Sequence, residues 1–225
     1  MPIKALIFDF DGLMVDTEMP AYRSWADLYA THGVELPLER WLLDLGTHGM
    51  FDACAELEAL TGKPVDREAT LRDRRAHHIS LCEQEGLRPG VAELIEAGHA
   101  AGLGLAVASS SDRAWIERWL RHHDILDRFG CIRTRDDVAR VKPAPDLFLS
   151  AAACLQVAPA ECVVFEDSPN GMRAAATARM RCVAVPTALI ASLELPAVAL
   201  RLESLADLPL DQLLRRLEAI SVPGE

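Results

Sequence analysis

The most constraining feature of the sequence is a short apolar run, Ala5 to Phe8, that ends in two carboxylates separated by one aromatic residue. The run has the length and composition of a buried strand. Because residues i and i+2 of an extended chain share a face, Asp9 and Asp11 are predicted to point into the same space at the strand's carboxyl end. Gly12 then permits a sharp turn. Two neighbouring carboxylates that lose water need a cation, a proton or a hydrogen-bond donor.

The second half of the chain alternates between apolar strand patterns and helical patterns. Beyond Gly90, the predicted strands are Leu103–Ala108, Cys131–Ile132, Cys162–Phe165 and Val183–Val185. Helices are predicted between these strands and at the carboxyl terminus, over Pro209–Ile220. Such alternation predicts an α/β fold with a parallel sheet that is covered on both faces.

Residues 17–86 follow a different pattern and contain no predicted strand. Four helical segments are separated by loops, and the breaker cluster Gly86–Gly90 follows the last of them. We therefore predict an α/β core from residues 1–16 and 87–225, into which an all-helical segment, residues 17–86, is inserted.

Composition limits the partners and the cellular setting. The net charge of −11 argues against a nucleic-acid polymer or an anionic membrane as partner. No apolar stretch reaches the roughly 18 residues of a membrane span, and a strand begins too early to leave room for a signal peptide. The six cysteines include no C-x-x-C pair, so we expect buried free thiols in a cytoplasmic protein. We expect a monomer or a weak dimer.

Polar residues follow three of the predicted strands. Ligands of parallel α/β sheets bind beyond the carboxyl ends of the strands. The residues predicted at this edge are Asp9 and Asp11 after the first strand, Ser109 to Asp112 after the second, and Glu166 and Asp167 after the fourth. Lys142 lies in a loop between elements and can reach the same edge.

These residue types support phosphoryl chemistry. Asp9, Asp11 and Asp167 offer oxygen ligands that suit Mg²⁺, and Ca²⁺ is the alternative. A carboxylate such as Asp9 can attack phosphorus, and a second carboxylate, Asp11, can protonate the leaving oxygen and later deprotonate water. Ser109, with neighbouring backbone N–H groups and Ser110 beside it, can bind phosphate oxygens. The Lys142 ammonium can offset the accumulated negative charge.

Each of these features also has a simpler interpretation. The Asp-Gly pair is common in polar turns, and Ser109 to Ser111 can cap the helix that contains Trp115. Lys142-Pro143 can be a solvated loop, and Glu166-Asp167 an acidic turn. The combination of all of them, in this order, is more specific than any single member.

The sequence resembles the haloacid dehalogenase superfamily, in the branch with a helical cap. The first motif is Phe8-Asp9-Phe10-Asp11-Gly12 through Asp16-Thr17-Glu18, the second is Ser109, the third Lys142-Pro143, and the fourth Phe165-Glu166-Asp167-Ser168-Pro169-Asn170-Gly171. The resemblance implies a Rossmann-like core, a mobile cap at residues 17–86, and magnesium-dependent phosphoryl transfer through Asp9. It also implies that Asp11 is the acid/base and a metal ligand through its carbonyl, that Asp167 binds the metal, and that Glu166 supports it.

Three functions fit this resemblance. The first is a magnesium-dependent phosphatase that hydrolyses a sugar phosphate or nucleoside monophosphate through an aspartyl phosphate. The second is a phosphomutase of the β-phosphoglucomutase type, whose cap histidine and arginine correspond here to Ala21 and Gly49. The third is a non-catalytic binding protein on the same fold. Dehalogenases of the superfamily lack the second aspartate, so its presence favours phosphate chemistry.

The helical insertion offers three candidate substrate contacts. His48 lies in a glycine-bounded loop, and Arg74 and His78 belong to a basic run on the fourth helical segment. A solvated loop histidine, and a solvated basic face that pairs with acids such as Asp73, are the alternatives.

Overall fold

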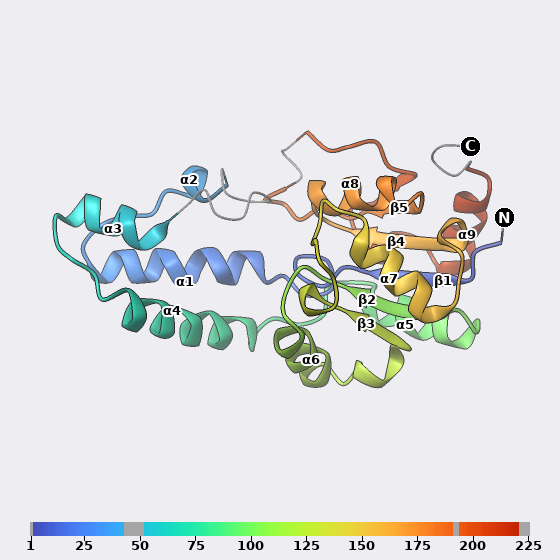
Figure 1. Ribbon diagram of the computed structural model, residues 1–225, viewed down its shortest axis with the longest axis horizontal. Coiled ribbons are helices and arrows are strands. Elements are labelled where there is room, and N and C mark those ends of the chain that lie inside the picture. Colours follow the sequence, from blue (N-terminus) through green and yellow to red (C-terminus); the bar gives the residue numbers. More distant parts are fainter. Residues whose placement is uncertain (1, 43–51, 191–193, 221–225) are drawn as a thin grey trace. The chain divides into compact units, whose positions relative to one another are not determined.

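The computed structural model describes residues 2–42, 52–190 and 194–220 (Figure 1). It divides into two compact units. Met1–Val15 together with Leu87–Glu225 forms the first, called here the α/β unit, and Asp16–Gly86 forms the second, called here the helical unit.

A parallel sheet organises the α/β unit. Its strand order is β3-β2-β1-β4-β5-β6, and every neighbouring pair is parallel. This confirms the predicted α/β fold with a parallel sheet and a helical insertion. The strands are β1 (Ala5–Phe8), β2 (Gly104–Ala108), β3 (Cys131–Arg133), β4 (Cys162–Glu166), β5 (Arg181–Ala184) and β6 (Leu200–Arg201).

The register places the carboxyl ends of the central strands at one level. Phe8 of β1 lies opposite Val107 of β2 and opposite Phe165 of β4. The residues that follow these strands therefore emerge side by side, which is how the fold assembles the polar edge described below.

Helices cover both faces of the sheet. The alternate residues Ala5 and Ile7 share a buried apolar cluster with residues of α7 and α8. On the other face, Gly98 of α5 would place a Cβ about 3.1 Å from a Leu6 methyl group, so a small residue allows close packing there. The helices of this unit are α5 (Val91–Ala100), α6 (Arg113–His122), α7 (Asp146–Leu155), α8 (Pro169–Thr177) and α9 (Leu210–Glu218).

The helical unit has its own small core. Trp25 and Tyr29 of α1 pack against Leu36, Cys54 and Leu57. The buried Tyr29 hydroxyl donates a hydrogen bond to the Ala53 carbonyl at 2.7 Å, which satisfies its polar end. The described helices are α1 (Glu18–Thr31), α2 (Leu38–Leu42), α3 (Ala53–Thr61) and α4 (Arg67–Cys82).

The cysteine prediction is wrong for two residues. Cys131 of β3 and Cys154 of α7 form a disulfide, with Cα atoms 6.2 Å apart. The packing of α7 on β3 brings together thiols that are 23 residues apart in sequence, and no local spacing pattern indicates this. The other four cysteines are buried free thiols, as predicted.

Two further details differ from expectation. Strand β6 was not predicted, because two residues carry no periodic signal. Helix α6 is capped by Asp112, whose side chain accepts a hydrogen bond from the Trp115 backbone N–H, and not by the preceding serines. Within the described ranges, no helix is both long and apolar enough to cross a membrane.

Candidate active site

The polar edge of the sheet is built by the residues that follow β1, β2 and β4. The backbone N–H of Asp9 donates to the Phe165 carbonyl of β4 at 3.0 Å, which continues the ladder one residue beyond the strand. Ser109 does the same against β3. Asp9, Ser109, Glu166 and Asp167 are all buried, so the backbone holds four polar side chains in a restricted space.

Lys142 connects the first and fourth motifs. Its Nζ contacts Asp9 Oδ1 and lies 2.6 Å from Glu166 Oε1. The ammonium also lies 4.9 Å from the ring centroid of Phe148, on α7. One ammonium therefore bridges two buried carboxylates, and the predicted approach of Lys142 to this edge is seen directly.

Burial and charge act in opposite directions on this pair. Burial raises the pKa of Asp9, and the negative charges of Glu166 and Asp11 raise it further, against the lowering effect of Lys142. Burial alone would lower the pKa of Lys142, but the charges of Asp9 and Glu166 outweigh it and raise this pKa. Lys142 is therefore held as the ammonium ion, and Asp9 needs additional positive charge to remain ionised near neutral pH.

Both carboxylate oxygens of Glu166 have partners. Oε1 accepts from Lys142, and Oε2 accepts from the backbone N–H and the hydroxyl of Ser168, each at 3.0 Å. A Cβ on Gly171 would lie 1.8 Å from Oε1, so only glycine fits at this point of α8. Glu166 therefore holds Lys142 and the start of α8 in place.

Asp167 completes an acidic cluster. Asp9, Glu166 and Asp167 each present a carboxylate oxygen, and these oxygens lie within 4.8 Å of one another. Gly12 has a φ of +82°, and a Cβ there would lie 2.2 Å from Asp167 Oδ2, so the turn and the carboxylate both require glycine. A buried set of oxygen ligands fits a hard divalent cation such as Mg²⁺.

Asp11 differs from the expectation that it points toward Asp9. Its Oδ1 accepts a hydrogen bond from Trp115 Nε1 at 2.8 Å. Its Oδ2 accepts from the Ser111 hydroxyl at 2.6 Å and from the Ser109 hydroxyl at 3.3 Å. The carboxylate is thus oriented toward α6 and the loop before it, and it is not one of the three that form the acidic cluster.

The serines lie in the loop after β2. Ser109 is buried, and its hydroxyl also accepts a hydrogen bond from the Ser111 backbone N–H at 3.0 Å. Ser110 is half-buried beside it. The loop is therefore ordered by bonds between its own members and Asp11.

The candidate contacts of the helical unit have structural partners. The Arg74 guanidinium lies over the Trp25 ring at 5.1 Å, and its buried Nε has no hydrogen-bond partner among the described residues. Burial and the charge of Arg75 lower the pKa of Arg74. His78 Nε2 lies 3.2 Å from the Thr17 carbonyl, while His48 lies outside the described residues.

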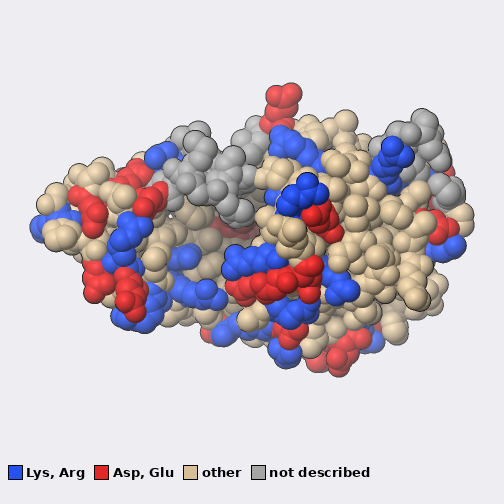
Figure 2. All heavy atoms as spheres, in the orientation of Figure 1, with Lys and Arg blue, Asp and Glu red and all other residues tan. Residues whose placement is uncertain are grey.

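The rest of the basic run agrees with a solvated, paired face. Arg72 pairs with Asp73, as predicted, and Arg67 pairs with Asp52. In the face that Figure 2 displays, basic and acidic side chains are intermixed. Arg74 stands out from this run because its guanidinium packs on an aromatic ring instead.

Sequence reasoning missed Trp115 as a member of the site, and it assigned no contact with Asp11 or Glu166 to Ser111, Ser168 or Gly171. The sequence pattern indicates only that Trp115 is an apolar residue near the start of a helix. Its indole N–H, a hydrogen-bond donor, is the one feature that could have suggested a polar contact. Ser168 caps α8, since its hydroxyl accepts from the Gly171 N–H, and the same hydroxyl donates to Glu166.

A parallel sheet with this acidic edge and a helical insertion after the first strand define a class of hydrolases. The chain belongs to the haloacid dehalogenase-like hydrolase family, whose model matches residues 3–179. The helical insertion places it in the helical-cap branch of that family.

Relatives in several bacteria match most of the chain. It is 42% identical to YhcW of Bacillus subtilis (strain 168) over 217 residues, covering 96% of this chain and 99% of YhcW. It is 35% identical to hexitol phosphatase B of Escherichia coli (strain K12), covering 82% and 84%. Among solved structures, CbbY of Rhodobacter sphaeroides in complex with phosphate is 30% identical, with a TM-score of 0.75 over 91% of this chain and 96% of CbbY.

Proposed function

We propose that the chain is a magnesium-dependent phosphatase that hydrolyses a small phosphorylated metabolite through an aspartyl phosphate on Asp9. The observation that carries this proposal is the buried arrangement of Asp9, Lys142, Glu166 and Asp167 at the carboxyl edge of the sheet. The name of hexitol phosphatase B, and the phosphate bound to CbbY, support the same chemistry.

The residues of the chain divide the reaction into two displacements. In the first, a carboxylate oxygen of Asp9 bonds to phosphorus while the bond from phosphorus to the ester oxygen breaks, and Asp11 gives its proton to that oxygen. In the second, Asp11 takes a proton from water, whose oxygen bonds to phosphorus as the bond to Asp9 breaks. Inorganic phosphate is released, and both aspartates return to their initial states.

Lys142 and Ser109 stabilise the charge of the transferred group. The Lys142 ammonium is already in contact with Asp9, so it needs no reorganisation to offset the negative charges of the carboxylate and the phosphate as they approach. Ser109 and the backbone N–H groups after β2 are proposed to bind phosphate oxygens, with Ser110 as an additional contact.

The acidic cluster is proposed to hold Mg²⁺. Asp9 and Asp167 would be ligands, with the Asp11 carbonyl as a further one, and Glu166 would act by holding Lys142, because its oxygens already accept hydrogen bonds. When bound, the ion offsets phosphate charge and lowers the pKa that burial raises at Asp9.

The substrate class is proposed to be a sugar phosphate or a nucleoside monophosphate. A variant of CbbY was solved in complex with xylulose-1,5-bisphosphate, and this favours a sugar phosphate. We propose that residues 17–86 act as the cap, which selects substrate and excludes water. Arg74 and His78 are its candidate substrate contacts, with His48 as a third.

A metabolite screen tests this proposal. Purified protein is incubated with sugar phosphates, alditol phosphates and nucleoside monophosphates, in Mg²⁺ or in EDTA, and released phosphate is measured. We expect release from a subset of esters in Mg²⁺, its loss in EDTA, and no turnover by Asp9→Asn. Isomerised product with little free phosphate would instead identify a phosphomutase. No change in any ester, in the presence of Mg²⁺, would contradict both.

A further inference from the structure

Besides Ser109, the carboxylate of Asp11 is held by two groups, one on each oxygen, that no part of the proposed reaction uses. Trp115 Nε1 donates to Oδ1 at 2.8 Å, and the Ser111 hydroxyl donates to Oδ2 at 2.6 Å. Trp115 and Ser111 lie about a hundred residues after Asp11 in the sequence, so only the fold brings the three side chains together.

The chemistry of the two donors is not equivalent. An indole N–H can only donate, so Oδ1 must remain an acceptor whenever the Trp115 bond is present. A serine hydroxyl can rotate and can donate or accept. Oδ2, which faces hydroxyl groups that can also accept, is therefore the oxygen better placed to exchange a proton.

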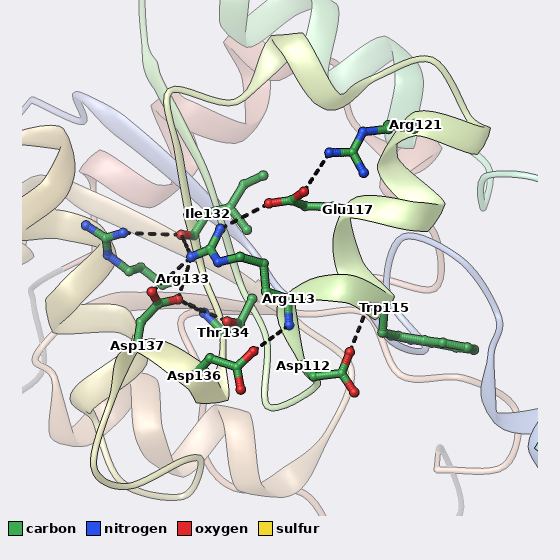
Figure 3. A network of polar contacts seen from close by, with 10 residues as sticks. All are labelled: Asp112, Arg113, Trp115, Glu117, Arg121, Ile132, Arg133, Thr134, Asp136 and Asp137. Atoms are coloured by element: carbon green, nitrogen blue, oxygen red, sulfur yellow. Dashed lines mark hydrogen bonds and ion pairs between the residues drawn. The ribbon is translucent and has the colours of Figure 1, made fainter.

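Trp115 is fixed by a network at the start of α6. The Trp115 backbone N–H donates to Asp112 Oδ1 at 2.8 Å, and the Arg113 backbone N–H donates to Asp136 at 2.9 Å. The Arg113 guanidinium pairs with Asp137 at 2.7 Å. Figure 3 shows these contacts joining the first turn of α6 to the segment after β3, with the Trp115 side chain extending away from them.

The partners of Asp137 make this support firm. The Thr134 backbone N–H donates to Asp137 Oδ2 at 2.8 Å, and the Thr134 hydroxyl donates to the same atom at 3.0 Å. Arg113 also donates to the Ile132 carbonyl of β3 at 3.2 Å. The indole N–H therefore projects from a turn that is tied directly to the edge of the sheet.

We propose that Trp115, assisted by Ser111, is a positioning residue that orients the carboxylate of Asp11 for proton transfer, with Oδ2 as the proton-carrying atom. This inference rests on the proposed phosphatase function. In the first displacement the proton on Oδ2 moves to the leaving oxygen as its bond to phosphorus breaks. In the second, the same oxygen receives a proton from the attacking water, so the cycle is balanced.

The test uses esters that differ in their need for a proton. The leaving group of an alkyl phosphate is a strongly basic alkoxide unless it is protonated as it leaves. The leaving group of p-nitrophenyl phosphate is a stabilised phenolate, which needs no proton. The quantity compared is kcat/KM, because it reports the steps up to phosphorylation of Asp9 and not the hydrolysis step that both esters share. We expect Trp115→Phe to lower kcat/KM at least about tenfold for the alkyl ester and about twofold or less for the aryl ester.

Trp119→Phe is the matched control. Trp119 lies on the same helix, and its ring contacts that of Trp115 edge to face at 5.3 Å. Its Nε1 is buried without a hydrogen-bond partner among the described residues. The substitution removes the same atoms four residues away, and we expect the ratio of the two kcat/KM values to remain that of the wild type.

A double-mutant cycle tests whether Trp115 acts through Asp11. In the Asp11→Asn background, Trp115→Phe should add less than about a twofold further loss for the alkyl ester. Ser111→Ala should reproduce the ester dependence of Trp115→Phe with a smaller amplitude. Equal losses for both esters in Trp115→Phe, or full additivity with Asp11→Asn, would overturn the positioning role while leaving the phosphatase function intact. A wild type that hydrolyses neither ester in Mg²⁺ would overturn both.

Discussion

Replacing Asp9 by asparagine is expected to stabilise the folded protein while abolishing turnover. The substitution removes one negative charge from the acidic cluster and nearly preserves the shape of the side chain. The nearby charges are those of Glu166 and Asp167, whose oxygens lie within 4.8 Å, and that of Lys142, which is in contact with Asp9.

The magnitude follows from Coulomb's law. With an effective dielectric constant of about 20, two carboxylates about 4.8 Å apart repel by about 3.5 kcal/mol. Asp9 takes part in two such pairs, which give about 7 kcal/mol, and the contact of its carboxylate with Lys142 returns a similar amount. Burial of the Asp9 charge therefore decides the sign, and it disfavours the ionised carboxylate. Each kcal/mol of this burial cost that the variant avoids corresponds to a rise in Tm of about 2–4 °C.

The pH dependence has a definite sign. Burial raises the pKa of Asp9 above that of an aspartate in the unfolded chain, about 3.9, so the folded wild type binds the proton more tightly. Ionising the buried Asp9 carboxyl costs free energy of folding, and below about pH 4 this carboxyl is protonated in both states. The wild type therefore loses stability as the pH rises from about 4 through the raised pKa of Asp9. Asp9→Asn has no such group, and the difference in Tm between the two proteins should widen toward neutral pH.

The assay is thermal unfolding in EDTA near pH 7, followed by the same measurement in Mg²⁺. Asp127→Asn removes an exposed carboxylate and serves as the control, with an expected change within about 0.5 kcal/mol. Mg²⁺ should raise the Tm of the wild type more than that of Asp9→Asn, because the ion compensates the charge that the variant lacks. If Asp9→Asn unfolds below the wild type in EDTA, the electrostatic reasoning is refuted.

Three further predictions concern the supports of the site. Gly171→Ala should lower kcat at least about tenfold and destabilise by about 1–3 kcal/mol, because its Cβ would lie 1.8 Å from Glu166 Oε1; wild-type kinetics and unfolding would contradict this. The hydrogen bonds and ion pair of Asp137 outweigh its burial and lower its pKa. Asp137→Asn should therefore cost about 1 kcal/mol at pH 7 in urea unfolding, a cost that shrinks as the pH falls below about 4 and through the lowered pKa. Reduction of the Cys131–Cys154 disulfide should lower stability by about 3 kcal/mol, and Cys131→Ser should make unfolding insensitive to reductant.

The sequence by itself determined the order of the elements and the edge at which the site lies. An apolar strand of four residues followed by Asp9, and a similar strand that ends at Glu166 and is followed by Asp167, are local patterns that do not depend on the rest of the chain. Because parallel strands end at a common edge, these patterns also place their carboxylates together. The cap of α8 by Ser168 is equally local, because its hydroxyl accepts from the N–H of Gly171, three residues later.

Only the tertiary structure decided which of these groups touch. Asp11 turns toward Trp115, Glu166 holds Lys142 with one oxygen, and Cys131 pairs with Cys154. Each of these contacts joins residues at least 23 positions apart, and each is set by the packing of a helix or a loop against the sheet. Hydrophobic periodicity fixes which face of an element is buried, but it does not specify the partner that a polar atom meets at the end of that element.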